Sequence, residues 1–234
     1  MGRAVILLQA RLGSRRLPGK VLAEIDGRTI LAHCVERLAR ERLAPVVVAT
    51  TTEPEDVAIV DEAHRLGALV LCGDRDDVLA RFTWAARELG ADIVVRATGD
   101  NPAVDMSAAA RCLRVLHATG ADYVVERGLP YGGAVEAVRA AALERAFEEA
   151  TDPADREHVT RFVRRQPTRF HVVEPRAPVA VTRPDLRFTV DTMEDLVYMR
   201  DVMTAAGPAD RPAPLVALVA AADRLAARVR EGAA

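Results

Sequence analysis

The protein has 234 residues, of which 50% are hydrophobic and 28% are charged, and its formal net charge is −2. This length is enough to bury the core of one domain, and the composition is that of an ordinary globular chain. The near-neutral charge supplies no global field for nucleic acid or anionic membranes, and no stretch approaches the roughly 20 apolar residues that span a bilayer, so we expect neither kind of partner.

Short β-branched runs alternate with amphipathic stretches of helical length in the first half of the chain. We predict strands at 4–9, 45–51, 68–71, 92–97 and 121–125, and helices at 29–42, 54–66, 77–89 and 107–119. Gly67, Gly90 and Gly120 each follow a predicted helix, where glycine commonly ends it. Continuous apolar strands that alternate with helices predict an α/β fold with a doubly wound, mostly parallel sheet.

The pattern is less regular after residue 126. We predict strands at 134–138, 170–173 and 186–190, and helices at 140–150, 152–165, 192–203 and 215–229. No internal repeat or low-complexity linker divides the chain, so we interpret 1–234 as a single domain. Within it, the segment of about 127–190 is expected to form an insertion or cap.

The cysteines and the N-terminus indicate a compartment. Cys34, Cys72 and Cys112 are odd in number and far apart, with no CxxC pair, which argues against a disulfide framework or a structural zinc site. The first apolar stretch is short and runs into Arg11, unlike a signal peptide. We therefore expect a cytoplasmic protein.

Lys20 is the only lysine among 32 basic residues, and it ends a loop, QARLGSRRLPGK, that directly follows the first predicted strand. A compact ammonium is the feature that arginine cannot reproduce, and Gly13 and Gly19 allow a close backbone approach to an anion. The loop matches neither the Walker A spacing nor GxGxxG. It predicts an anion-binding site, with a solvated basic surface as the alternative.

Two aspartates follow predicted strands. Asp100 follows the strand 92–97, and Asp191 follows the strand 186–190. Ligands bind at the carboxyl edge of a doubly wound sheet, and one or two carboxylates are what Mg²⁺ takes from a protein. The alternative for Asp100 is a turn cap before Pro102, and for Asp191 a cap of the following helix.

Two further segments carry polar groups. The run Asp74-Arg75-Asp76 has the spelling with which metal-dependent glycosyltransferases hold a sugar nucleotide, but Asp76 or Asp77 precedes a helix-length stretch, so N-capping, which we favour, explains at least one of these aspartates without function. His158 lies in a charged predicted helix and could face a ligand, although the chain has no second histidine at metal-ligand spacing.

Six strings together resemble the cytidylyltransferases, in particular the branch of spore coat polysaccharide biosynthesis protein F, which is related to CMP-KDO synthetase and CMP-sialic acid synthetase. The strings are QARLGSRRLPGK, VVATTTEPED, GDRDDVLARF, VVRATGDNP, DREHVT and FTVDTMEDL, and they occur in the family's order over most of the chain. The resemblance implies a nucleotide-diphospho-sugar transferase (Rossmann-like) fold. It also implies transfer of CMP from CTP to a sugar acid or another small acidic or hydroxylated acceptor, with release of pyrophosphate.

The resemblance further implies site residues, a cofactor and a partner. Catalytic roles fall on Arg11, Lys20 and Asp100, and Mg²⁺ would be held by Asp100 and Asp191. Nucleotide-binding residues would be Gln9, Ala10, Arg11, Gly13, Ser14, Arg16, Lys20, Thr98 and Asp100. Acceptor-binding residues would be Glu136, Arg156, Glu157 and His158. A homodimer formed through 127–190 is also implied.

Three positions depart from the pattern of that branch. Ala134 replaces an aspartate, Asn101 a cysteine and Arg161 a proline. Ala134 and Arg161 fall in the expected acceptor half, so the identity of the acceptor stays open. Three alternatives also stay open: transfer of a different nucleotide, a metal-dependent glycosyltransferase that uses Asp74 and Asp76, and a nucleotide-binding protein without catalytic activity.

Overall fold

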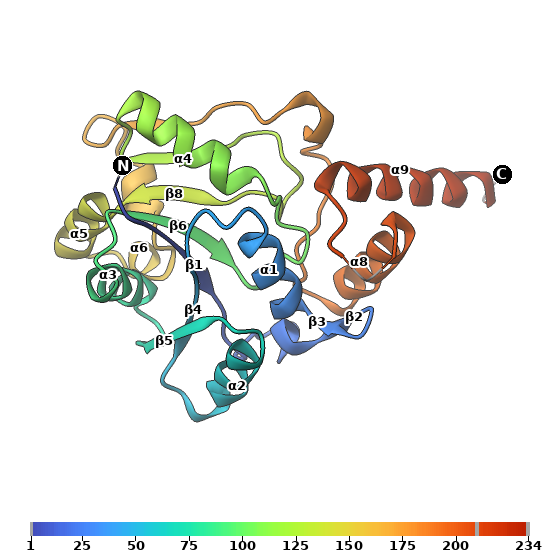
Figure 1. Ribbon diagram of the computed structural model, residues 1–234, viewed down its shortest axis with the longest axis horizontal. Coiled ribbons are helices and arrows are strands. Elements are labelled where there is room, and N and C mark those ends of the chain that lie inside the picture. Colours follow the sequence, from blue (N-terminus) through green and yellow to red (C-terminus); the bar gives the residue numbers. More distant parts are fainter. Residues whose placement is uncertain (1, 209–210, 233–234) are drawn as a thin grey trace.

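The computed structural model describes residues 2–208 and 211–232 and contains a central seven-stranded sheet (Figure 1). Its strands, in the order β5-β4-β1-β6-β8-β7-β9, are β5 (Leu69–Gly73), β4 (Val46–Thr51), β1 (Ala4–Gln9), β6 (Ile93–Thr98), β8 (Glu136–Arg139), β7 (Tyr123–Val125) and β9 (Val172–Val173). Only β8 runs antiparallel to its neighbours in this sheet. The predicted mostly parallel α/β fold is therefore confirmed.

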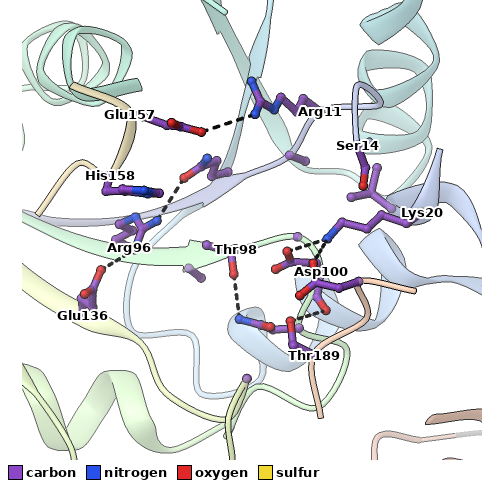
Figure 2. A pocket seen from close by; sticks show the side chains of 18 of the residues that line it. Arg11, Ser14, Lys20, Arg96, Thr98, Asp100, Glu136, Glu157, His158 and Thr189 are labelled. Atoms are coloured by element: carbon purple, nitrogen blue, oxygen red, sulfur yellow. Dashed lines mark hydrogen bonds and ion pairs between the residues drawn. The ribbon is translucent and has the colours of Figure 1, made fainter. Parts of the chain in front are cut away.

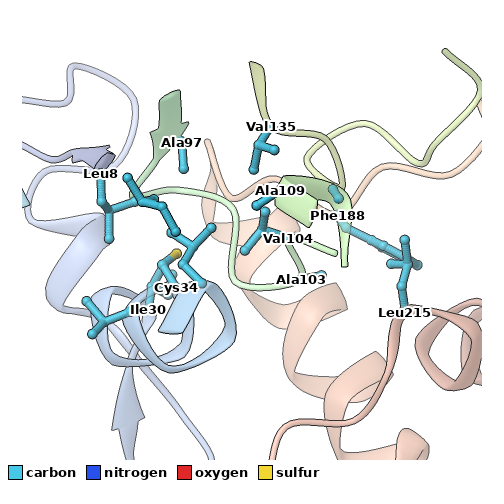
Figure 3. Packing of buried hydrophobic residues seen from close by; sticks show 14 of the residues in the cluster. Leu8, Ile30, Cys34, Ala97, Ala103, Val104, Ala109, Val135, Phe188 and Leu215 are labelled. Carbon is cyan, nitrogen blue, oxygen red and sulfur yellow. The ribbon is translucent and has the colours of Figure 1, made fainter. Parts of the chain in front are cut away.

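Helices cover both faces of this sheet. Among the described residues they are α1 (Ile30–Ala39), α2 (Val57–Arg65), α3 (Val78–Glu88), α4 (Ala108–Thr119), α5 (Ala140–Glu149), α6 (Pro153–Glu157), α7 (Arg161–Arg164), α8 (Met193–Ala206) and α9 (Leu215–Gly232). Side chains alternate along a strand, so Val5 and Leu7 of β1 pack in the core with α3 and α5, and Ile6 and Leu8 pack in the core with α1 and α4. Figure 3 shows part of the second of these clusters.

Local sequence accounts for several helix ends. The Thr29 side chain accepts a hydrogen bond from the backbone N–H of Ala32 at the start of α1. Thr192 and Asp195 form a capping box at the start of α8. Gly120 ends α4 in the left-handed conformation, as the glycine after that helix predicted. Short additions are the hairpin of β2 (Glu24–Ile25) and β3 (Arg28–Thr29), and the 3₁₀ turns η1 (Lys20–Leu22), η2 (Pro54–Asp56) and η3 (Val179–Val181).

Two predicted elements are wrong. The helix predicted at 152–165 is broken into α6 and α7 at Val159, which has φ of 24°. Val159 is completely buried and the Thr160 hydroxyl donates to Glu136, so tertiary contacts override the helical pattern. The strand predicted at 186–190 makes only an isolated bridge between Tyr131 and Arg187, because this segment crosses beside Asp100 instead of joining the edge of the sheet.

The segment 127–190 contributes to the central sheet itself. It supplies β8, which lies between β6 and β7, and β9, which pairs with β7. A role for this segment in a dimer stays a prediction. Of the helices within the described ranges, none has the length and apolar character required to cross a bilayer.

Candidate active site

A cavity of about 1390 Å³ opens at the carboxyl ends of β1 and β6. The chain passes from β1 to β4 and β5 on one side and returns to β6 on the other, so the strand order reverses between β1 and β6. Such a switch point is where doubly wound sheets bind ligands. All candidate site residues from the sequence line the cavity: Gln9, Ala10, Arg11, Gly13, Ser14, Arg16, Lys20, Thr98, Asp100, Glu136, Arg156, Glu157, His158 and Asp191.

The loop after β1 forms one end of the cavity. Its backbone is fixed by Asp56, whose carboxylate accepts from the N–H of Leu12 at 2.7 Å. Gly19 adopts φ of 71°, a left-handed conformation that favours glycine, and directly precedes Lys20. Gly99 comes close to the end of β1, since a Cβ at this position would lie 3.0 Å from the carbonyl oxygen of Gln9. These constraints hold the first loop and the segment after β6 against each other.

Lys20 lies between the two aspartates (Figure 2). Its Nζ donates to Oδ2 of Asp100 and to Oδ1 of Asp191, each at 2.8 Å, and its side chain is 10% exposed. Arg16 approaches the same Oδ1 of Asp191 at 3.0 Å. Burial acts to raise the pKa of Asp191, but the hydrogen bonds from Lys20 and Arg187 outweigh it and hold that pKa below its ordinary value.

The donor set around Lys20 fits a magnesium ion. Asp100 and Asp191 both lie within hydrogen-bond distance of one ammonium nitrogen, so their carboxylates share a single cation position. Their oxygens are the ligands that Mg²⁺ prefers, and it commonly takes only one or two protein carboxylates. No cluster of three or more His, Cys, Asp or Glu with metal-binding geometry occurs in 2–208 or 211–232. The remaining ligands of such an ion would therefore be water and phosphate oxygens.

Glu136 lies at the other end of the view in Figure 2, with Arg96 and His158. It is 9% exposed and accepts hydrogen bonds from Arg96 at 2.5 Å and Tyr123 at 2.6 Å. Thr160 donates to it at 3.1 Å. Burial acts to raise the pKa of Glu136, but the positive charge of Arg96 and the Tyr123 hydrogen bond outweigh it and lower that pKa.

The sequence interpretation did not single out the partners of Glu136. Arg96 interrupts an otherwise apolar strand, β6, and a charged residue at such a position indicates a buried ion-pair partner elsewhere in the chain. Its pairing with Glu136 depends on β8 lying antiparallel beside β6, where the two residues are register partners. Arg164 also reaches Glu136, at 3.4 Å.

The other expected acceptor residues lie on the cavity wall. Arg156 donates to Asp77 and, at 2.7 Å, to the carbonyl of Phe147, and its guanidinium stacks over the Phe147 ring. Glu157 is exposed and lies 3.8 Å from Nη2 of Arg11. His158 is exposed as well. Arg156 thus holds α6 to the start of α3, whereas Glu157 points toward Arg11 (Figure 2) and His158 lines the cavity.

Asp74 of the DxD spelling caps a turn, and the neighbouring Asp77 caps α3. Oδ1 of Asp74 accepts from the backbone N–H groups of Asp76 at 2.8 Å and Asp77 at 2.7 Å, and these hydrogen bonds lower the pKa of Asp74. Asp77 caps α3 through the N–H of Ala80. The capping alternative predicts a helix cap at Asp76 or Asp77, and the structure has it at Asp77.

Comparisons with known proteins show relatives of this chain in sequence and in fold. A family model described as cytidylyltransferase matches residues 5–208. Spore coat polysaccharide biosynthesis protein SpsF of Bacillus subtilis is 30% identical over 218 residues, which cover 91% of this chain and 90% of that protein. A 3-deoxy-manno-octulosonate cytidylyltransferase of Trichlorobacter lovleyi is 35% identical over 103 residues, 43% of this chain and 40% of that protein.

A solved structure extends the similarity to the whole fold. The cytidylyltransferase from Leptospira borgpetersenii serovar Hardjo-bovis superposes with a TM-score of 0.89 at 28% identity. The match covers 97% of this chain and 96% of that one. The nucleotide-diphospho-sugar transferase fold expected from the sequence is thereby confirmed.

Proposed function

The chain belongs to the cytidylyltransferase family, and we propose that it transfers CMP from CTP to a small acidic acceptor, a sugar acid, with release of pyrophosphate and with Mg²⁺ as cofactor. The observation that carries this proposal is the arrangement of Lys20, Asp100 and Asp191 in one cavity at the switch point of the sheet. The named activity of the Trichlorobacter lovleyi relative supports a sugar acid as acceptor.

The reaction divides naturally between the two ends of the cavity. A nucleophilic oxygen of the acceptor attacks the α-phosphorus of CTP, and the bond from that phosphorus to the bridging oxygen of the β-phosphate breaks. Pyrophosphate leaves with the electron pair, and the proton of the acceptor passes to solvent or a nearby base. Such a step depends on positioning and on cations that stabilise phosphoryl charge, and it needs no protein nucleophile.

The first loop supplies the groups for the nucleotide. Arg11, Arg16 and Lys20 would neutralise the triphosphate, with Lys20 toward the leaving pyrophosphate. Ser14 and the backbone of Gly13 would donate to phosphate oxygens. Gln9, Ala10 and Thr98 line the same cavity and would contact the nucleotide.

Asp100 and Asp191 would hold the magnesium ion. When bound, it would neutralise charge on the phosphate oxygens. Lys20, which contacts both carboxylates in this structure, would then be available to the phosphates.

The proposal is tested by measuring pyrophosphate release from CTP, ATP, GTP and UTP in the presence of Mg²⁺ and a set of sugar acids. We expect release with CTP and at least one sugar acid. If pyrophosphate is released with one of the other nucleotides and not with CTP, that nucleotide is the donor. Sugar transfer from a nucleotide sugar, without pyrophosphate release, would favour a glycosyltransferase. Tight CTP binding without turnover would favour a binding protein.

A further inference from the structure

The hydrogen-bonding capacity of the Arg96 guanidinium is only partly used by the protein. Its Nη1 donates to Glu136, and its Nη2 lies 3.3 Å from Oε1 of Gln9. Its Nε is buried and has no hydrogen-bond partner among the described residues. A buried donor without a partner is costly, and a guanidinium has five donors to satisfy. The Arg96 side chain is 18% exposed and lines the cavity, so a ligand oxygen there could accept from Nη hydrogens that Glu136 and Gln9 leave free.

Glu136 is saturated with donors. Its oxygens accept from Arg96, Tyr123, Thr160 and Arg164. A carboxylate has about four lone-pair sites, so Glu136 has little capacity left for a hydroxyl of the acceptor. Its position between two arginines instead fixes the directions in which their guanidinium groups point.

Arg164 complements Arg96 from a different element. It belongs to α7, and its side chain is 53% exposed and lines the cavity. Within the described part of the chain, the one hydrogen bond of its side chain is the long contact with Glu136, at 3.4 Å. Most of its donors are therefore oriented by Glu136 without being satisfied by it.

Arg96 lies apart from Lys20, the cation expected toward the leaving pyrophosphate. In Figure 2, Arg96 and Glu136 lie at one side of the cavity, and Lys20 and Asp100 lie at the other. Arg96 also precedes Asp100 by four residues along β6 and the turn that follows it. A ligand bound by Lys20 and a ligand bound by Arg96 can thus occupy the cavity side by side.

We propose that Arg96 and Arg164 bind an anionic group of the acceptor and that Glu136 is the positioning residue that orients them. This inference rests on the proposed function, since it concerns the acceptor end of the same cavity. Guanidinium groups bind the paired oxygens of a carboxylate or phosphate with two parallel hydrogen bonds. The acceptor class is therefore a sugar derivative that carries such an anionic oxygen pair, and a neutral analogue is rejected.

The experiment compares acceptors that differ only in this group. Pyrophosphate release from CTP is measured with glucuronate and glucuronamide, 3-deoxy-manno-octulosonate and its amide, and glucose 6-phosphate and glucose. We expect the wild-type protein to use the anionic member of at least one pair and to reject its neutral partner. Comparison of the carboxylate pairs with the phosphate pair then shows whether the acceptor's anionic group is a carboxylate or a phosphate.

Arg164→Met is the principal variant, because this exposed side chain contributes little to folding. Loss of a charged hydrogen-bond donor is expected to raise the KM for the anionic acceptor about 10- to 100-fold and to leave the KM for CTP unchanged. Arg164→Lys should restore part of the loss. Arg169→Met is the matched control, since the Arg169 side chain is also exposed, at 42%, and pairs with Glu149. This control should match the wild type.

Glu136→Gln tests the positioning role. It should raise the KM for the acceptor and leave that for CTP unchanged, whereas a structural defect alone would change both. Equal use of acidic and neutral acceptors, or unchanged KM values in Arg164→Met, would overturn the inference and leave the proposed function standing. Absence of pyrophosphate release from CTP with every acceptor would overturn the proposed function and the inference together.

Discussion

Nζ of Lys20 donates to Oδ2 of Asp100 at 2.8 Å, and this contact joins the loop after β1 to the turn after β6. The same nitrogen donates to Asp191, so one ammonium lies between two carboxylates. Two carboxylates that converge on one point repel each other unless a cation lies between them. In the structure that cation is Lys20, and the proposed function requires that a magnesium ion can take its position.

Lys20→Met is expected to lower kcat for pyrophosphate release by about 10²–10³-fold, since it removes a cation that would stabilise charge in the transition state. The fold should be retained, because Lys20 lies in a loop and not in the hydrophobic core. Steady-state kinetics and circular dichroism measure the two effects. Lys20→Arg is the informative companion, because a planar guanidinium is not equivalent to a compact ammonium. Wild-type rates in both variants would contradict the role of Lys20.

Asp100→Asn should weaken binding of Mn²⁺, used as a paramagnetic substitute for Mg²⁺, by at least about 10-fold. Mutation of residues that only hydrogen-bond to metal ligands already lowers metal affinity by about this factor, so loss of a direct ligand should do no less. Water proton relaxation measures this binding directly, without turnover. Asp185→Asn is the control, because Asp185 is 61% exposed and pairs with Arg183 away from the cavity. Equal Mn²⁺ affinities in the two variants would place the metal elsewhere.

Lys20→Met should change Mn²⁺ affinity in the opposite direction. In the nucleotide-free protein, the Lys20 ammonium lies between Asp100 and Asp191. When methionine replaces Lys20, Mn²⁺ no longer has to compete with this ammonium for the two carboxylates. We expect tighter Mn²⁺ binding than in the wild type under these conditions, measured by the same relaxation experiment. Weaker binding would show that Lys20 does not compete for the metal position.

The arrangement of Lys20 and Asp100 was predictable from local patterns. The loop that ends at Lys20 and the turn that contains Asp100 each follow an apolar run typical of a buried parallel strand. The carboxyl ends of such strands meet at one edge of a sheet. The pairing of Arg96 with Glu136 was not predictable in this way. It depends on β8 inserting antiparallel between β6 and β7. This strand order is set by tertiary contacts, and the hydrophobic periodicity of the sequence does not indicate it.

The break between α6 and α7 has a similar origin. The charged run around His158 has a helical pattern, and nothing local indicates that Val159 will adopt φ of 24°. The break brings Thr160 to Glu136, a contact over 24 residues of chain. Such tertiary contacts decide the shape of the acceptor end, whereas the nucleotide end follows from the strand and its loop.

Asp74→Ala should separate the capping interpretation from a glycosyltransferase site. Asp74 accepts two backbone hydrogen bonds in the turn before α3, so its loss is expected to lower the free energy of unfolding by about 1 kcal/mol. Pyrophosphate release should stay close to the wild-type rate. Urea unfolding and the standard kinetic assay test both parts. Loss of activity with unchanged stability would instead assign Asp74 to the site.

Glu136→Gln should destabilise the protein in a pH-dependent way. At pH 7 the substitution leaves Arg96 without its buried counter-charge, and we expect the free energy of unfolding to fall by about 3 kcal/mol. The pKa of Glu136 is lowered in the folded state, so its stabilising contribution is fully present above its unfolded pKa of about 4.3 and is lost as the pH falls through the folded pKa.

The difference in unfolding free energy between wild type and Glu136→Gln should therefore be constant near neutral pH and shrink in acid, below about pH 4. Urea unfolding across pH 3–8 measures it. Glu148→Gln, at an exposed position of α5, is the matched control and should follow the wild type at every pH. If this difference in unfolding free energy stays the same in acid, the destabilisation of Glu136→Gln arises from packing and not from the charge of Glu136. The network around Arg96 would then need no ionised carboxylate.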